Sequence, residues 1–305
     1  MVDESGEDQR IDNFLLKTLK GVPKSHIYRI LRSGEVRVNS KRVSAEYRLT
    51  LEDRIRIPPV RVAETVERKV RIPPVGQRLA ERILFEDEGL LVIDKPAGLA
   101  VHGGSGISQG VIEQLRAEFP QCRFLELAHR LDRETSGVLL LAKKRSALTG
   151  LHTMMRDGAM DKRYLTLVSG QWKNARQSVK LSLTKYLTAD GERRVSVDKE
   201  GQSAHTIFRL IENFENFTLL EAELKTGRTH QIRVHLAHTG FPIACDDKYG
   251  DFALNKMLIK QGLKRMFLHA YRITFSHPLS GQAMEITAPL PAELEAFLRS
   301  LRGNQ

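Results

Sequence analysis

LAHRLDRETSGVLLLAKK, residues 127–144, joins a polar segment to a short apolar one. The apolar part, 137–142 (GVLLLA), is a continuous run of strand length, which predicts a strand buried on both faces. The polar part should then be a loop at the start of that strand, where functional side chains are both fixed and exposed. In this loop Asp132 is flanked by Arg130 and Arg133, which should keep its carboxylate ionised and offer sites for phosphate. A turn with an ordinary surface ion pair is the alternative.

Composition points to a globular protein with a polyanionic partner. The 305 residues, of which 41% are hydrophobic, suffice for one large domain and a small one. The net charge of +11 and the pI of about 9.7 favour nucleic acid as the partner. The charge is concentrated towards the N-terminus, since residues 10–72 hold 16 Lys and Arg against 7 Asp and Glu.

The cysteines and the apolar segments indicate the compartment. Cys122 and Cys245 are far apart and belong to no C-x-x-C pair, so neither a disulfide framework nor a zinc ribbon is expected. No basic N-terminal segment precedes an apolar one, and no apolar run approaches the length of about 18 residues that spans a bilayer. We therefore expect a cytoplasmic protein without a membrane partner.

The chain divides into two expected domains. Residues 1–9 are acidic and polar and should form a disordered tail. Residues 10–60 combine two short helical patterns with two short strand patterns, which predicts a very small basic domain. Residues 61–81 should be a linker, because RIPPV occurs at 56–60 and again at 71–75 and paired prolines favour extended chain. Residues 82–302 should form the large domain.

The small domain carries a recognisable pattern. RIDNFLLKTLKGVPKSHIYRILRSGEVRVNSKRV (10–43), followed by LEDRIRI (51–57), resembles the S4 RNA-binding domain. The resemblance implies that the second helix, expected over 24–31, and the turn after the first strand contact RNA. The residues expected there are Lys24, Ser25, Tyr28, Arg29, Arg32, Asn39, Lys41 and Arg42. A charged helix that merely faces solvent is the alternative.

In the large domain, strand patterns are expected at 90–94, 137–143, 162–169, 203–210 and 218–224. A helix is expected over 230–239, with Thr229 as its N-cap and Gly240 as its stop. Three histidines lie on or beside this helix, and they raise the question of a metal site: His230, His235 and His238. No H-E-x-x-H motif and no acidic ligand accompany them on the helix, so no metal is expected.

Three stretches resemble one family as a set. DKPAGLAVHGGSG (94–106), HRLDRETSGVLLLAKK (129–144) and TGRTHQIRVHLAHTGFPIACDDKYG (226–250) are similar to the motifs of the RluA-type pseudouridine synthases. The resemblance implies an α+β protein, in which a small S4 domain of the αL type precedes a catalytic domain with a mixed, largely antiparallel sheet flanked by helices. It also implies isomerisation of uridine to pseudouridine in RNA.

The resemblance implies the site residues motif by motif. Asp132 of HRLD matches the family's essential aspartate, and Arg233 of THQIR matches the arginine that pairs with it. Tyr164 of KRYLTLV matches the active-site tyrosine. Arg130 of HRLD matches the arginine that enters the RNA stack where the target uridine leaves. Taken without the family, Tyr164 would be interpreted as a half-buried strand tyrosine.

The chemistry of the family agrees with these residue types. Isomerisation breaks the C1′–N1 bond and forms a C1′–C5 bond without redox change or net hydrolysis, so neither cofactor nor metal is expected. An ionised carboxylate can act as nucleophile or proton acceptor, and Arg233 should keep Asp132 charged. Extruding a base from structured RNA costs free energy, part of which an inserted Arg130 would offset.

The substrate and the reaction leave alternatives open. Within the family the chain is most similar to members that act on the large ribosomal subunit, which implies a monomer acting on 23S rRNA or on the assembling subunit. Another rRNA site or tRNA is the alternative substrate, and a non-catalytic rRNA-binding assembly factor is the alternative function. A glycosidase would need Glu134 as a second carboxylate. A nuclease would need a metal cluster built on Asp246 and Asp247.

Overall fold

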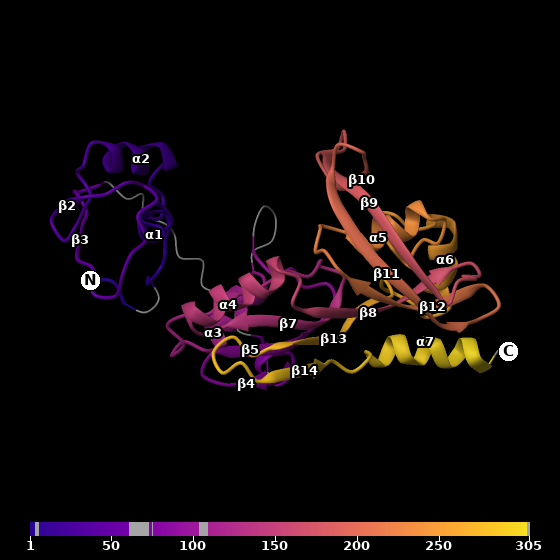
Figure 1. The fold of residues 1–305 in the computed structure, drawn as a ribbon. Coiled ribbons are helices and arrows are strands. Elements are labelled where there is room, and N and C mark those ends of the chain that lie inside the picture. The colour runs from indigo at the N-terminus through magenta and orange to yellow at the C-terminus, as the bar shows by residue number, and fades with distance from the viewer. Residues whose placement is uncertain (4–5, 61–72, 75, 104–108, 304–305) are drawn as a thin grey trace.

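The computed structural model describes residues 1–3, 6–60, 73–74, 76–103 and 109–303. An N-terminal α+β part lies beside one extended sheet with helices on both faces (Figure 1). The expected class, a small α+β domain followed by a mixed, largely antiparallel sheet flanked by helices, is confirmed. Within the described residues, no helix is long and apolar enough to cross a membrane.

The N-terminal part packs two helices on a three-stranded antiparallel sheet of order β2-β1-β3. Its elements are α1 (Ile11–Thr18), α2 (Lys24–Arg32), β1 (Arg37–Val38), β2 (Lys41–Arg42) and β3 (Ile55–Arg56). The apolar positions that predicted the helices are buried together, among them Ile11, Leu15 and Ile27. The β1–β2 turn places Asn39 and Ser40 at φ of 48° and 66°, the left-handed conformation that a two-residue hairpin requires.

The expected disordered tail is wrong for the residues described there. Val2 is 3% exposed and belongs to the core of the N-terminal part. Its backbone N–H donates to Asp53 O at 2.8 Å, and its carbonyl accepts from Glu52 at 2.9 Å. One apolar side chain and these backbone hydrogen bonds attach the segment, although its composition is that of a solvated tail.

The large sheet has the strand order β10-β9-β11-β12-β8-β13-β7-β5-β4, with β14 on β13 and β6 on β7. All neighbours are antiparallel except β13 and β7, which run parallel. The strands are β4 (Ile83–Glu86), β5 (Leu90–Lys95), β6 (Glu126–Leu127), β7 (Ser136–Ala142), β8 (Asp161–Ser169), β9 (Arg176–Leu187), β10 (Arg193–Val197), β11 (Gln202–Asn213), β12 (Phe217–Leu224), β13 (Leu268–Ser276) and β14 (Ala283–Thr287). Strands β9 and β10 were not among the predicted strands.

Helices lie on both faces of this sheet. They are η1 (Leu79–Arg82), α3 (Val111–Glu118), α4 (Arg145–Arg156), α5 (Gln231–His238), α6 (Phe252–Lys260) and α7 (Ala292–Gly303). The helices α3 and α5 pack into one apolar cluster, and α4, α6 and α7 into two others. Leu79 of η1 is buried in the first of these clusters, so the large domain begins before residue 82, within the expected linker. Residues 61–72 and 75 of that linker lie outside the described residues.

Strand β7 is buried on both faces, as its sequence predicted. Every residue of β7 is buried, and successive leucines enter opposite clusters: Leu139 packs on the α5 side and Leu140 on the α4 side. Each such leucine contributes about 2 kcal/mol through its burial. Gly137 has a φ of 111°, and a Cβ there would lie 2.2 Å from Ala270 O of β13. Only glycine allows this close approach, which brings β13 against the start of β7.

Candidate active site

The polar loop that precedes β7 forms one wall of a pocket of about 430 Å³. The opposite walls come from β8 and from the segment that enters α5. Thus Asp132, Arg130, Tyr164 and Arg233, which the sequence proposed as one site, line the same pocket. The segments that carry them lie far apart in sequence. The order β8-β13-β7 brings Tyr164 of β8 near the loop of Arg130 and Asp132, and α5 adds Arg233.

A buried lysine fixes the Asp132 loop. Lys95, at the end of β5, is 0% exposed and its Nζ donates to three carbonyl oxygens, including Arg133 O at 3.0 Å. The N–H of Gly98 donates to the same oxygen at 2.8 Å. Burial lowers the pKa of Lys95 to about 7, because an ammonium group is poorly solvated there. The sequence offered no signal that would have separated this lysine from an ordinary strand-end residue.

The charges closest to Asp132 are not the ones that its sequence neighbours suggested. Arg133 forms its ion pair with Glu134, at 2.7 Å, and Arg130 is exposed at the edge of the pocket. The ion pairs of the Asp132 carboxylate are with Arg233 Nη1 at 3.7 Å and with His230 Nε2 at 3.8 Å. The expected ion pairing with the flanking arginines is therefore wrong: Arg133 pairs with Glu134 instead, and the described residues show no ion pair between Arg130 and Asp132.

Arg233 is held more tightly by another carboxylate. Its Nε and Nη2 donate to Asp246 at 2.7 and 2.6 Å, and Nη2 also donates to Asp247 at 2.9 Å. Arg233 is 2% exposed and Asp246 is 0% exposed. Burial lowers the pKa of Arg233, but the hydrogen bond and charge of Asp246 outweigh it and raise that pKa. Arg233 is thus fixed from behind and presents Nη1 to Asp132.

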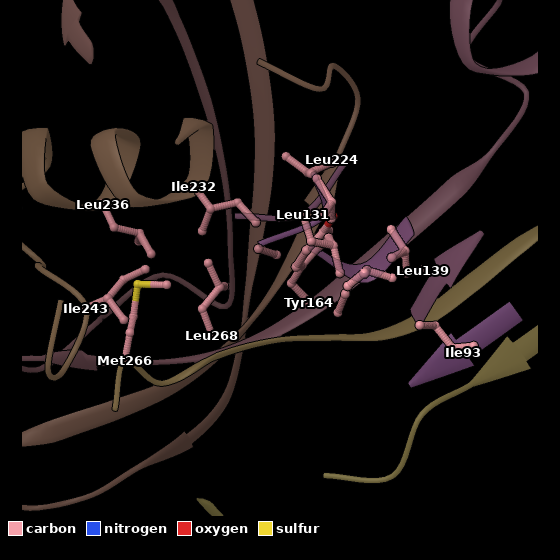
Figure 2. Packing of buried hydrophobic residues seen from close by; sticks show 14 of the residues in the cluster. Ile93, Leu131, Leu139, Tyr164, Leu224, Ile232, Leu236, Ile243, Met266 and Leu268 are labelled. Atoms are coloured by element: carbon pink, nitrogen blue, oxygen red, sulfur yellow. The ribbon is translucent and has the colours of Figure 1, made fainter. Parts of the chain in front are cut away.

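Tyr164 lies in the apolar floor of the pocket. Figure 2 shows its ring among Leu131, Leu139 and Leu224, below Ile232 of α5. Burial raises the pKa of the Tyr164 hydroxyl, and the charge of Asp132 raises it further. The hydroxyl therefore stays protonated at neutral pH and can donate a hydrogen bond to a pocket ligand.

His129 and Lys162 are among the further basic residues that line the pocket and were not expected. His129 Nε2 accepts a hydrogen bond from Leu140 N–H at 3.1 Å, and burial lowers the pKa of His129 to about 4. His129 is therefore neutral and supports β7. Lys162 lies at the start of β8, where burial lowers its pKa. Its ammonium group adds positive charge to the pocket.

The α5 histidines do not form a metal centre in the described part of the chain, where no cluster of three or more His, Cys, Asp or Glu could hold an ion. His235 is buried inside the domain, and His238 is exposed. His230 occupies the N-cap position of α5 with a φ of 51° and caps no backbone N–H with its side chain. The expectation that Thr229 would be the N-cap is wrong, because the chain enters the helix one residue later.

The proposed RNA-binding residues of the N-terminal part form a basic surface on α2 and the β1–β2 turn. Seven of them are exposed: Lys24, Ser25, Arg29, Arg32, Asn39, Lys41 and Arg42. Tyr28 is half-buried, and its hydroxyl donates to Asp12 at 2.9 Å. The side chain of Asn39 donates to Asp53 at 2.7 Å and accepts from Arg54 N–H at 2.9 Å, so it also holds the turn in place.

Known proteins resemble the chain over nearly its full length. The chain matches the family model of RNA pseudouridylate synthase over residues 89–238 and that of the S4 domain over residues 9–55. The ribosomal large subunit pseudouridine synthase C of Yersinia pestis is 55% identical over 303 residues, which cover 99% of this chain and 94% of that protein. The protein of the same name from Escherichia coli strain K12 is 54% identical, with coverages of 98% and 94%. The solved structure of human RNA pseudouridylate synthase domain containing 4 is 26% identical with a TM-score of 0.60, covering 73% of this chain and 94% of that chain.

Proposed function

The chain belongs to the RNA pseudouridylate synthase family and is a pseudouridine synthase, and on that premise we propose that it converts uridines of 23S rRNA to pseudouridine with Asp132 as the catalytic carboxylate. The observation that carries the proposal is the position of Asp132. Its side chain is 18% exposed, faces a pocket and has Arg233 on one side. An accessible carboxylate beside a fixed cation is suited to nucleophilic or proton-transfer chemistry.

The proposed reaction needs nothing beyond the RNA. The C1′–N1 bond breaks, the uracil turns, a C1′–C5 bond forms, and the proton lost from C5 is balanced by the proton gained at N1. Asp132 would act at the sugar or the base, and Arg233 would keep it charged and aimed. Neither an oxidant nor a metal enters this balance.

The remaining site residues have proposed roles that follow from their positions. Tyr164, in the apolar floor, would stack on the extruded uracil and direct its protonated hydroxyl at the base. Arg130, exposed at the rim, would enter the RNA stack in place of the extruded base and offset part of the unstacking cost. Lys162, inside the pocket, is suited to a phosphate or a uracil oxygen.

The N-terminal part would supply affinity for the RNA. Its exposed basic residues on α2 and the β1–β2 turn can neutralise phosphates, and the S4 domain match agrees with that role. We propose residues 10–60 as the RNA-binding domain and the region from Leu79 to 302 as the catalytic domain. We also propose a cytoplasmic location and a monomeric state, both of which are compatible with a ribosomal RNA substrate. The names of the relatives support the large-subunit RNA rather than another rRNA or tRNA.

The decisive experiment is a tritium-release assay on 23S rRNA that carries tritium at C5 of uridine. Asp132→Asn should lower release by about a thousandfold or more while RNA affinity holds. Glu134→Gln is the matched control, since Glu134 lies two residues away and pairs with Arg133, and it should stay active. Turnover by Asp132→Asn within tenfold of wild type would remove Asp132 from the mechanism. Pseudouridine mapping after gene deletion tests the substrate: loss confined to tRNA would refute the 23S assignment.

A further inference from the structure

The ring of His230 bridges Asp132 and a tyrosine outside the proposed catalytic set. Its Nε2 lies 3.8 Å from Asp132 Oδ1, and its Nδ1 lies 2.8 Å from the hydroxyl of Tyr249. The side chain of His230 is 13% exposed and lines the pocket. Tyr249 also packs against the Arg233 guanidinium, whose central carbon is 5.2 Å from the ring centre. One tyrosine therefore supports both groups that face Asp132.

The hydrogen bonds of Tyr249 determine which nitrogen of His230 carries the proton. The Tyr249 hydroxyl accepts from Val195 N–H at 2.9 Å. Its own proton must be donated, and His230 Nδ1 is the partner within reach among the described residues. Nδ1 therefore accepts, and the ring proton lies on Nε2, which faces Asp132. The opposite tautomer would leave the hydroxyl proton without an acceptor in a largely buried site.

Burial, more than the surrounding charges, keeps this imidazole neutral at neutral pH. Burial lowers the pKa of His230, the charge of Asp132 opposes that effect, and Arg233 reinforces it. From the segment after α5, Lys248 lowers the pKa further and Asp246 raises it. A neutral ring directs one N–H at Asp132 without forming a full ion pair, which would hold the carboxylate away from a substrate.

The backbone at His230 is strained in a way that serves this placement. A φ of 51° is rare for a residue with a side chain, and α5 begins there without a side-chain cap. Such strain persists where the surrounding structure requires it. Here the residue in this conformation is the one whose imidazole faces Asp132.

We propose that His230, oriented by Tyr249, is a positioning residue for Asp132, and this inference rests on the proposed catalytic role of Asp132. Arg233 and His230 approach different oxygens of the carboxylate, at 3.7 and 3.8 Å, both longer than a hydrogen bond. The carboxylate is thereby aimed while its lone pairs stay available for the substrate. The contacts should tighten when RNA fills the pocket.

The test compares His230→Gln and Tyr249→Phe with wild type in steady-state pseudouridine formation. His230→Gln should lower kcat about a hundredfold with little change in KM, because a misplaced Asp132 still allows the RNA to bind. Tyr249→Phe should cause a smaller loss of kcat. The aromatic ring still packs on Arg233, but without the hydroxyl the ring proton of His230 is no longer fixed on Nε2. His238→Gln is the matched control, because His238 is exposed on the same helix and does not line the pocket.

The pH profile separates positioning from a merely structural role. In wild type, protonating His230 converts its weak contact with Asp132 into an ion pair and stops turnover at low pH. His230→Gln removes this protonation step, so the acidic limb of kcat/KM should move to lower pH. The limb should stay in place in His238→Gln.

Three outcomes remain distinguishable. No pseudouridine from the wild-type protein on 23S rRNA, or turnover by Asp132→Asn, would refute the proposed function itself. If Asp132→Asn is inactive, two results would refute only the role of His230. One is a wild-type kcat in His230→Gln, and the other is an acidic limb of kcat/KM that does not move in that variant. If His230→Gln does not fold, ¹⁵N NMR of the His230 imidazole in the wild-type protein decides. A proton on Nε2 supports the inference, and a proton on Nδ1 overturns it.

Discussion

Asp246 and Asp247 are adjacent carboxylates that bind the same nitrogen of Arg233, yet replacing each by Asn should have very different effects. Asp246 is 0% exposed and forms two hydrogen bonds to the guanidinium, at 2.7 and 2.6 Å. The Asp247 side chain is 58% exposed and forms one, at 2.9 Å. Breaking a buried pair leaves an uncompensated charge and costs about 3 to 5 kcal/mol. An exposed pair contributes under about 1 kcal/mol.

For Asp246→Asn the lower end of that range applies, because Arg233 keeps Asp247 and Asp132 as partners. Asn cannot replace the carboxylate fully. Oδ1 of Asp246 also accepts from the N–H groups of Lys248 and Tyr249, so an amide that keeps these bonds turns its own N–H towards Arg233. We expect a loss of about 3 kcal/mol, which lowers Tm by about 6 to 12 °C in a domain of this size.

Urea unfolding of the wild type and of both variants measures these losses in the free energy of unfolding, provided that the three proteins have equal m-values. The hydrogen bond and charge of Arg233 outweigh burial and hold the pKa of Asp246 below its ordinary value. The stabilisation is therefore complete above a pH of about 4 and is lost as the pH falls through the lower, folded-state pKa. Asp246→Asn should abolish that part of the acid sensitivity. Equal losses in the two variants, or none in Asp246→Asn, would refute the assignment of Asp246 as the buried anchor.

Three further substitutions test other parts of the molecule. Tyr164→Phe should keep RNA affinity in filter binding and lower single-turnover rates about a hundredfold or more; an unchanged rate would exclude the hydroxyl from proton transfer. Replacing Arg29 and Arg32 by Gln should weaken RNA binding and reduce the slope of log K against log salt by about 0.7 to 0.9 per lost phosphate contact; an unaltered slope would remove α2 from the interface. Gly137→Ala should cost about 3 kcal/mol or more, since its Cβ would meet Ala270 O at 2.2 Å with φ at 111°, and a wild-type urea midpoint would contradict this.

The sequence by itself determined the elements with a strong local pattern. The apolar run of β7 predicted a strand buried on both faces, and the 3.6-residue spacing of Ile11 and Leu15 predicted α1. The mixed sheet and the pocket residues followed from resemblance to family motifs. Strands β9 and β10 were not predicted, although Val179, Leu181 and Leu183 of β9 alternate with polar residues. Three apolar residues in a mostly polar strand, half of whose residues are exposed, make a much weaker signal than the continuous apolar run of β7.

Only the tertiary structure decided which charges meet. Arg130 and Arg133 are the sequence neighbours of Asp132, but its ion pairs come from α5, and the tightest partner of Arg233 is Asp246. Lys95, at the end of β5, donates a hydrogen bond to the loop that carries Asp132, although the two segments are separate in sequence. The strength of a charge pair depends on distance and burial, which the order of strands and the packing of helices determine. Sequence spacing contains neither quantity, so residue types could be predicted while their partners could not.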